Sequence, residues 1–218
     1  MIDGFGRNID YLRISVTDRC NFRCTYCMPE MQSFLPQPDL LSYDEITTLV
    51  GRFINHGIRK IRLTGGEPLV RRDIAVLINA LGQHVKNGDL EELTMTTNGS
   101  RLEQFAPILA AAGMKRINVS LDTLDPDQFK RISRGGNLDT VLNGIQAAKA
   151  HGLDIKINMV ALKDENEDAL IPMMTFCAQK GFDLTLIETM PLGAGVSDRE
   201  ANYISLEAFT APVRESEG

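Results

Sequence analysis

The sequence has little of what several classes of protein require. It has no apolar run long enough to cross a bilayer, and its first residues, MIDGFGRNID, lack the apolar core of a secretory signal. Its formal net charge of −6 argues against broad binding to nucleic acid or to an anionic membrane. It has four cysteines, and three of them are too close together to staple distant segments. We therefore expect a cytosolic protein whose cysteines bind metal.

Strand-like and helical segments alternate along most of the chain. Such alternation implies a parallel sheet with right-handed crossovers. A capping box at Ser42 and Glu45 opens one helix, and glycines such as Gly57 and Gly113 stand where helices should end. The strands are predicted at residues 12–17, 60–63, 92–96, 116–120, 154–160 and 183–189. We expect one α/β domain over residues 1–190, followed by an irregular tail over residues 191–218.

All but the last of the predicted strands alternate apolar and polar residues. Parallel strands covered on both faces normally read as continuous apolar runs. Because successive side chains point to opposite faces, each of these strands has an apolar face for the helices and a polar face on the other side. The polar face carries Arg13, Arg62 and Lys156, which a packed barrel interior would not hold. We predict a partial (β/α)6 barrel of the TIM type with an open interior for a polar ligand. The alternative is a sheet with one solvated face.

The cysteine motif, Cys20-Asn-Phe-Arg-Cys24-Thr-Tyr-Cys27, follows the first predicted strand. Active sites of β/α barrels lie at that end of the strands. A structural zinc site would need a fourth ligand, and the remaining cysteine, Cys177, is better explained as a small buried residue of a helix. Three cysteinates on a [4Fe–4S] cluster leave one iron free to bind another molecule. We therefore favour the iron–sulfur cluster over zinc.

This motif resembles the signature of the radical S-adenosylmethionine (SAM) superfamily. In that superfamily the free iron binds the amino and carboxylate groups of SAM, and one electron releases a deoxyadenosyl radical. Residues 64–68, TGGEP, resemble the superfamily's GGEP element, whose backbone and glutamate contact the methionine amino group. Glycine permits a close backbone approach, and an acid suits an ammonium. Alone, GGEP would be an ordinary turn, but behind this cysteine motif it supports a radical SAM core.

Nearly the whole chain resembles the N-terminal part of the GTP 3′,8-cyclases, the molybdenum cofactor biosynthesis protein A family. The stretches that carry the resemblance are DYLRISVTDRCNFRCTYCMP, IRLTGGEPLVRRD, TTNG, INVSLDTLDP, IKINMV and IETMPLG. The resemblance implies that the radical abstracts hydrogen from the ribose of GTP and that the carbon radical then attacks guanine C8. The family context implies a reduced flavodoxin-type electron donor and a downstream pterin-forming enzyme.

The resemblance also assigns roles to single residues. The matches to GTP contacts are Arg13, Arg62, Thr96 and Lys156. The matches to SAM contacts are Gly66, Glu67, Ser120, Met190 and the backbone of Tyr26. Independently of the resemblance, the GTP residues and Ser120 lie on the inward parity, where buried cations need an anionic partner such as a triphosphate.

These residues also have other interpretations. Arg13 or Arg62 could pair with Asp122 or Glu188, and Lys156 could reach solvent. Met190 at a strand end is typically a core residue. For Arg71 and Arg72 the choice lies between phosphate contacts and a solvated helix start, and we favour the helix start.

The resemblance ends with the chain. Family members continue further, with three more cysteines for a second cluster and a final Gly-Gly, whereas this sequence stops at Gly218 and Cys177 matches no ligand of that second cluster. We therefore expect guanine anchoring, and with it cyclisation, to be impaired or lost, with three interpretations of the chain open: a truncated form, a fragment or a shortened paralogue. Three hypotheses follow: a GTP cyclase or its catalytic core, a radical SAM enzyme for another anionic substrate, and a non-enzymatic metal-binding module.

Overall fold

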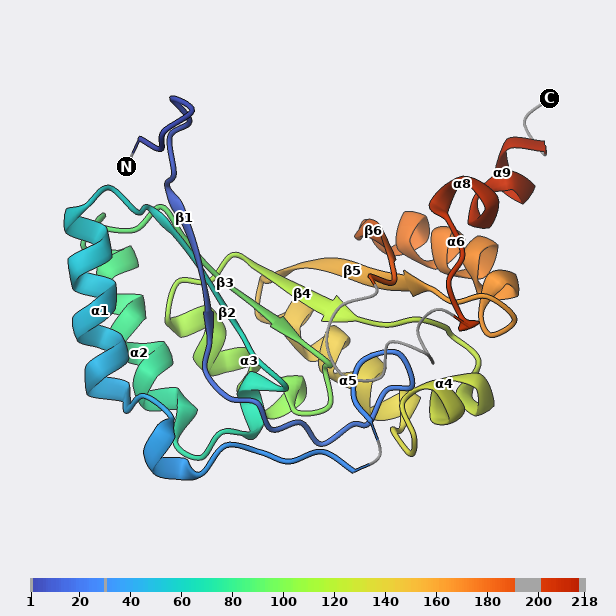
Figure 1. Cartoon of the computed structure of the whole chain (residues 1–218), viewed down its shortest axis with the longest axis horizontal. Helices are drawn as coiled ribbons and strands as arrows, with labels where there is room; N and C mark the ends of the chain where they lie inside the picture. The colour runs from blue at the N-terminus through green and yellow to red at the C-terminus, as the bar shows by residue number, and fades with distance from the viewer. Residues whose placement is uncertain (1, 30, 191–200, 216–218) are drawn as a thin grey trace.

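A computed structural model describes residues 2–29, 31–190 and 201–215 (Figure 1). The six strands form a single sheet in the order β1-β2-β3-β4-β5-β6, and every neighbouring pair is parallel. The strands are β1 (Tyr11–Ser15), β2 (Lys60–Thr64), β3 (Glu92–Thr97), β4 (Arg116–Ser120), β5 (Asp154–Ala161) and β6 (Asp183–Glu188). Because β1 and β6 are the two edges of the sheet, the barrel is partial, as predicted.

Helices connect the strands. They are α1 (Tyr43–Asn55), α2 (Ile74–Lys86), α3 (Leu102–Ala111), α4 (Pro126–Ile132), α5 (Leu138–Ala150) and α6 (Leu170–Lys180). The predicted capping box opens α1: Ser42 Oγ accepts from Glu45 N (3.2 Å), and Glu45 Oε2 accepts from Ser42 N (2.7 Å). A short 3-10 helix, η2 (Pro68–Val70), precedes α2. None of the helices in the described residues is long and apolar enough to cross a membrane.

The predicted C-terminal tail falls partly on residues 191–200 and 216–218, which lie outside the described residues. Within residues 201–215 the structure has two short helices, α8 (Leu206–Phe209) and α9 (Ala211–Glu215). Ser205 caps α8 by accepting from Ala208 N (3.2 Å). Phe209 of α8 is buried and belongs to the hydrophobic core.

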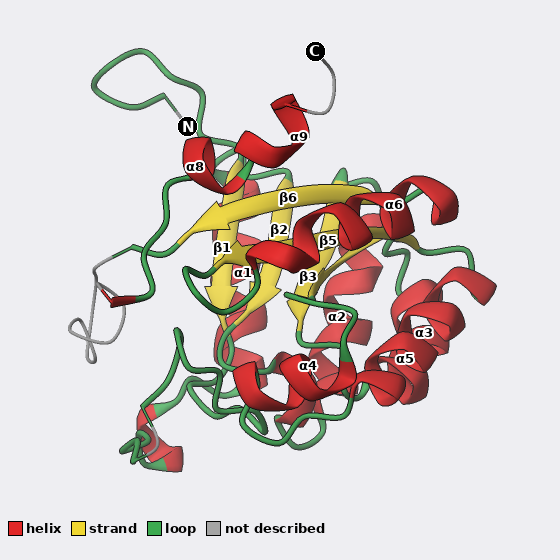
Figure 2. Cartoon of the chain, turned by 90° about the vertical axis from the view of Figure 1, so that its right-hand side faces the viewer, coloured by secondary structure: helices red, strands yellow, loops and turns green. Residues whose placement is uncertain are grey.

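The hydrophobic core lies between the sheet and its helices. In the middle strands, every second residue is at most 3% exposed, and all of these except Thr97 of β3 are apolar; examples are Ile61, Met95, Val119 and Ile157. The residues between them are mostly polar and half-buried, because they face the open side of the sheet. The sheet is strongly twisted, so that β6 runs across the direction of β1 and β2 (Figure 2). The twist curves the polar face into the inner wall of the partial barrel.

Candidate functional site

The loop that carries the cysteines, residues 16–28, begins as an extension of the sheet. Its backbone pairs with that of the GGEP turn beyond the end of β2. The hydrogen bonds run from Val16 N to Thr64 O (2.8 Å), from Gly66 N to Thr17 O (2.7 Å) and from Glu67 N to Arg19 O (2.8 Å). The first half of this cluster loop therefore has the register of a strand, although it is a loop.

The two glycines of GGEP are required by this close pairing. Gly65 has a φ of +152°, which side chains rarely adopt. A Cβ atom on Gly65 would collide with the backbone of Thr17, and one on Gly66 with the backbone of Arg19. The approach of SAM was the expected reason for glycine at these positions. The packing of the cluster loop is a second reason, already present in the protein itself.

The second half of the cluster loop is attached to the end of α4. Arg23 N donates to Ser133 O (3.1 Å), and Thr25 N donates to Ile132 O (2.9 Å). Phe22 packs edge-to-face on Phe129, with 6.0 Å between the ring centroids. In Figure 2, β1 and β2 point toward the loops beside α4. The loop is thus held on both sides, by the GGEP turn and by α4.

The three thiols of the loop suit an iron–sulfur cluster. Cys20 and Cys24 are half-buried and Cys27 is exposed, and none of the three forms a disulfide in the described structure. Burial raises the pKa of the Cys20 and Cys24 thiols, and the nearby Asp122 carboxylate adds to the effect on Cys24. These sites therefore favour thiolates only when a cation such as iron compensates their charge. Cys177 lies in α6 and is part of the hydrophobic core, as predicted. Burial raises the pKa of its thiol to about 11.

No three His, Cys, Asp or Glu side chains among the described residues are grouped as around a single metal ion. In a [4Fe–4S] cluster each cysteinate binds a different iron, so the three thiols need not converge on one point.

Glu67 of the GGEP turn has a structural role that the sequence analysis missed. Its carboxylate is fully buried, where Oε1 accepts from Leu69 N (3.0 Å) and Thr97 Oγ1 (2.8 Å), and Oε2 accepts from Asn98 N (2.6 Å). Burial raises the pKa of Glu67, and these three donors oppose that effect. Glu67 thus connects the GGEP turn to the turn that follows β3. Its contact with SAM stays a prediction.

Tyr26 connects the cluster loop to the ends of β4 and β5. Its hydroxyl donates to Asp122 Oδ2 (2.8 Å), and Asp122 Oδ1 accepts from Val160 N (2.8 Å). Burial raises the pKa of Asp122 to about 6. Asp122 was one possible partner of Arg13 or Arg62, but in the described structure it pairs with Tyr26 instead.

The other acid considered as a partner, Glu188, accepts from Leu206 N (2.7 Å) and from Tyr203 Oη (3.4 Å). Within the described residues, neither Asp122 nor Glu188 forms an ion pair with Arg13 or Arg62. In the part of the chain that the structure describes, these two acids therefore do not neutralise Arg13 or Arg62.

The residues predicted to bind GTP lie on the inner face of neighbouring strands. The register places Arg13 beside Arg62, Thr96 beside Asn118, Asn118 beside Lys156, and Ser120 beside Asn158. Asn118 was not among the predicted site residues. It is 2% exposed, and its buried Oδ1 has no hydrogen-bond partner in the described structure. Arg62 lies over the ring of Tyr11 at 5.6 Å, and its buried Nε also has no partner there.

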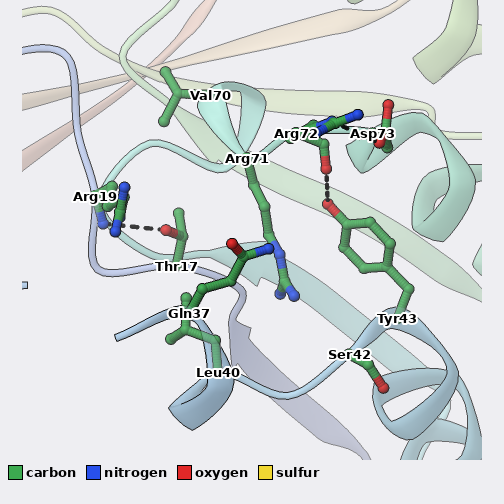
Figure 3. A pocket seen from close by; sticks show the side chains of 10 residues that line it. All are labelled: Thr17, Arg19, Gln37, Leu40, Ser42, Tyr43, Val70, Arg71, Arg72 and Asp73. Atoms are coloured by element: carbon green, nitrogen blue, oxygen red, sulfur yellow. Dashed lines mark hydrogen bonds and ion pairs between the residues drawn. The ribbon is translucent and has the colours of Figure 1, made fainter. Parts of the chain in front are cut away.

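Arg71 and Arg72 line a different cavity, of about 490 Å³, between the cluster loop and the starts of α1 and α2 (Figure 3). Arg71 donates to Val16 O (2.7 Å) and to Leu41 O (2.5 Å), and its guanidinium lies over Tyr43 at 4.4 Å. The solvated position that we favoured is wrong for Arg71, which joins two loops. It is correct for Arg72, whose side chain is 93% exposed.

Met190, at the end of β6, is 63% exposed. Its interpretation as a core residue is therefore wrong, and its contact with SAM stays a prediction.

The fold and the three-cysteine loop together define the class of the protein. Residues 14–177 match the sequence profile described as the radical SAM superfamily, and the chain belongs to this superfamily. Its cofactors are therefore a [4Fe–4S] cluster and SAM, which the donor set of the cluster loop fits.

The sequence is similar to curated GTP 3′,8-cyclases. That of Mesorhizobium japonicum is 57% identical over 97% of this chain and 64% of its own length. That of Agrobacterium fabrum is 54% identical over 97% of this chain and 60% of its own length. The chain thus spans about three fifths of the length of the curated relatives it matches.

Solved structures with the same fold are more distant in sequence. Streptococcus suis SuiB bound to the precursor peptide SuiA has a TM-score of 0.77 at 18% identity, over 95% of this chain and 46% of that one. Methylornithine synthase has a TM-score of 0.70 at 15% identity, over 94% of this chain and 61% of that one. These similarities concern the fold.

Proposed function

We propose that this chain is the radical SAM core of a GTP 3′,8-cyclase, which converts GTP to 3′,8-cyclo-7,8-dihydro-GTP in the first step of molybdenum cofactor biosynthesis. The observation that carries the proposal is the 57% identity to a curated cyclase along 97% of the chain. The arrangement of Arg13, Arg62 and Lys156 on one inner face supports it, since a triphosphate matches three cations that have no acidic partner among the described residues.

The residues of the chain divide the work by position. Cys20, Cys24 and Cys27 hold the cluster. Gly66, Glu67, Ser120, Met190 and the backbone of Tyr26 hold SAM. Arg13, Arg62, Thr96 and Lys156 bind GTP and fix its ribose inside the partial barrel. When bound, the cluster and SAM supply the deoxyadenosyl radical that abstracts hydrogen from the ribose.

In this proposal the cyclase has two protein partners, an electron donor and a downstream enzyme. A reduced flavodoxin-type protein in the cytoplasm delivers the electron to the cluster, and a pterin-forming enzyme consumes the cyclised nucleotide. Support for both comes from the family resemblance of the sequence.

The test is anaerobic reconstitution of the chain with iron and sulfide, followed by dithionite, SAM and GTP. Deoxyadenosine and the cyclised nucleotide are measured by mass spectrometry, and formation of both would establish that the chain is a competent cyclase. Deoxyadenosine without cyclised nucleotide would show that the 218-residue chain cleaves SAM but does not complete the reaction on GTP. Stoichiometric zinc without iron would instead support a metal-binding module.

Lys156→Ala tests the GTP site separately. Loss of one charge-assisted contact costs about 1.5–3 kcal/mol, so GTP should bind roughly ten- to a hundredfold more weakly. SAM cleavage without GTP should stay nearly unchanged. The matched control is Lys86→Ala, because Lys86 is exposed and lies at the end of α2. Equal loss of GTP binding and SAM cleavage in Lys156→Ala would assign Lys156 to the scaffold and not to the substrate.

A further inference from the structure

Asn98, in the turn after β3, brings a hydrogen-bond donor to the cluster loop. Its Nδ2 lies 3.7 Å from Cys20 Sγ and 2.9 Å from Asn21 Oδ1. Cys20 Sγ also accepts from Phe22 N at 3.4 Å. This cysteine sulfur therefore receives two N–H groups, one from the loop itself and one from a side chain 78 residues further along the chain.

The orientation of the Asn98 amide is determined by its surroundings. Its Oδ1 accepts from Ser100 N (3.0 Å) and Ser100 Oγ (2.7 Å). A flipped amide would place its NH2 group against the Ser100 N–H, donor against donor. The NH2 group therefore has to face Cys20 and Asn21.

The backbone of Asn98 is also fixed. Its N–H donates to the buried Glu67 carboxylate at 2.6 Å. The preceding residue, Thr97, is 2% exposed, and its hydroxyl donates to the same carboxylate. A side chain held at both its backbone and its amide oxygen loses little entropy when it donates to sulfur.

Hydrogen bonds to the cysteine sulfurs of an iron–sulfur cluster are one of the means by which a protein sets the reduction potential. An N–H donor withdraws negative charge from the sulfur, which favours the reduced cluster because that state carries one more negative charge. Reduction of the cluster precedes cleavage of SAM, so this potential determines how easily a donor can start the reaction.

We propose that Asn98 raises the reduction potential of the [4Fe–4S] cluster by donating a hydrogen bond from Nδ2 to Cys20 Sγ. The inference rests on the cluster assignment of the proposed function but not on GTP as substrate. Asn98 acts through Cys20 and is a positioning residue, not a catalytic one.

The test uses the 218-residue chain, reconstituted anaerobically without SAM or GTP. Asn98→Ala removes the donor. Asn98→Asp keeps the shape and the oxygen that faces Ser100, but places a carboxylate oxygen against the sulfur. Asn87→Asp is the matched control: Asn87 is exposed and follows α2 at the opposite end of the sheet from the cluster loop. Iron and sulfide content are measured first, and the midpoint potential is then measured by redox titration followed by electron paramagnetic resonance.

For Asn98→Ala and Asn98→Asp we expect the iron content of the wild type and a midpoint potential more negative than that of the wild type. If the hydrogen bond is stronger by about 1 kcal/mol in the reduced than in the oxidised state, its loss in Asn98→Ala gives a roughly fivefold lower ratio of reduced to oxidised cluster at a given potential. The change should exceed tenfold in Asn98→Asp, that is, about 59 mV or more for a one-electron couple. Asn87→Asp should match the wild type.

Two results would overturn the inference. One is an unchanged potential in Asn98→Ala and Asn98→Asp at full iron content. The other is loss of the cluster from both variants while Asn87→Asp retains it, because Asn98 would then serve cluster retention and not the potential. Since the titration contains no GTP, a shifted potential together with absent GTP turnover would support this inference, while the proposed cyclisation by this chain would fail.

Discussion

Replacing Phe22 by Ala should destabilise the chain even when no iron is bound. Phe22 is 8% exposed and Phe129 is 4% exposed, and the two rings meet edge-to-face at 81°. Gly136 packs closely beside both rings. A Cβ atom at this position would lie 3.0 Å from one atom of each ring. Phe22 is therefore the apolar anchor by which the cluster loop packs on α4.

The magnitude follows from burial. Removal of a buried phenylalanine ring costs about 3–5 kcal/mol in a well-packed core. Phe22 lies in a loop that can partly collapse onto the cavity, so we expect about 3 kcal/mol. The edge-to-face contact contributes about 0.5–1.5 kcal/mol of this beyond the buried area.

The assay is urea unfolding of the metal-free protein, followed by circular dichroism, for Phe22→Ala, Phe129→Ala and the double variant. The double-mutant cycle should give a coupling energy of about 1 kcal/mol. Phe5→Ala is the control, because Phe5 is 87% exposed and should change stability by less than about 0.5 kcal/mol. A Phe22→Ala variant as stable as Phe5→Ala, or a coupling energy of zero, would refute the anchoring of the loop.

Two further predictions concern buried acids. Glu67→Ala removes the acceptor of the buried Leu69 N–H and of the half-buried Asn98 N–H, and should lower the free energy of unfolding by about 3 kcal/mol without SAM. An unchanged urea midpoint would restrict Glu67 to binding SAM. Burial raises the pKa of Asp122 from 3.8 to about 6, so the folded state binds the extra proton and the wild type should lose roughly 3 kcal/mol of stability as the pH rises from about 4 to above 6. Asp122→Asn should lack this loss, and parallel pH profiles of the two proteins would contradict the assignment.

The architecture could be predicted from the sequence because its pattern is local and periodic. Residues 116–120 were predicted as a strand and form β4. The first strand was predicted to run to Thr17, whereas β1 ends at Ser15. The difference is small in physical terms, because the backbone pairing with the GGEP turn continues past Ser15.

The contacts that assemble the site could not be predicted in the same way. The hydrogen bonds of Glu67 to the turn after β3 depend on how two loops pack, and no periodicity records that. For Arg71, adjacency to Arg72 suggested one environment for both, but only Arg71 reaches the carbonyls of two loops. Asn118 could have been predicted as a site residue, because it has the same inward parity as Ser120. In the sheet it neighbours Thr96 and Lys156.

The division of the strands into two faces has a consequence for how such a protein can evolve. The apolar residues that hold the sheet to its helices never face the interior of the barrel, and residues such as Arg13, Thr96 and Lys156 contribute little to the core. Mutations on the inner face can therefore change the ligand while the scaffold keeps its stability. The same scaffold can host different chemistry, and SuiB and methylornithine synthase share this fold at only 18% and 15% identity.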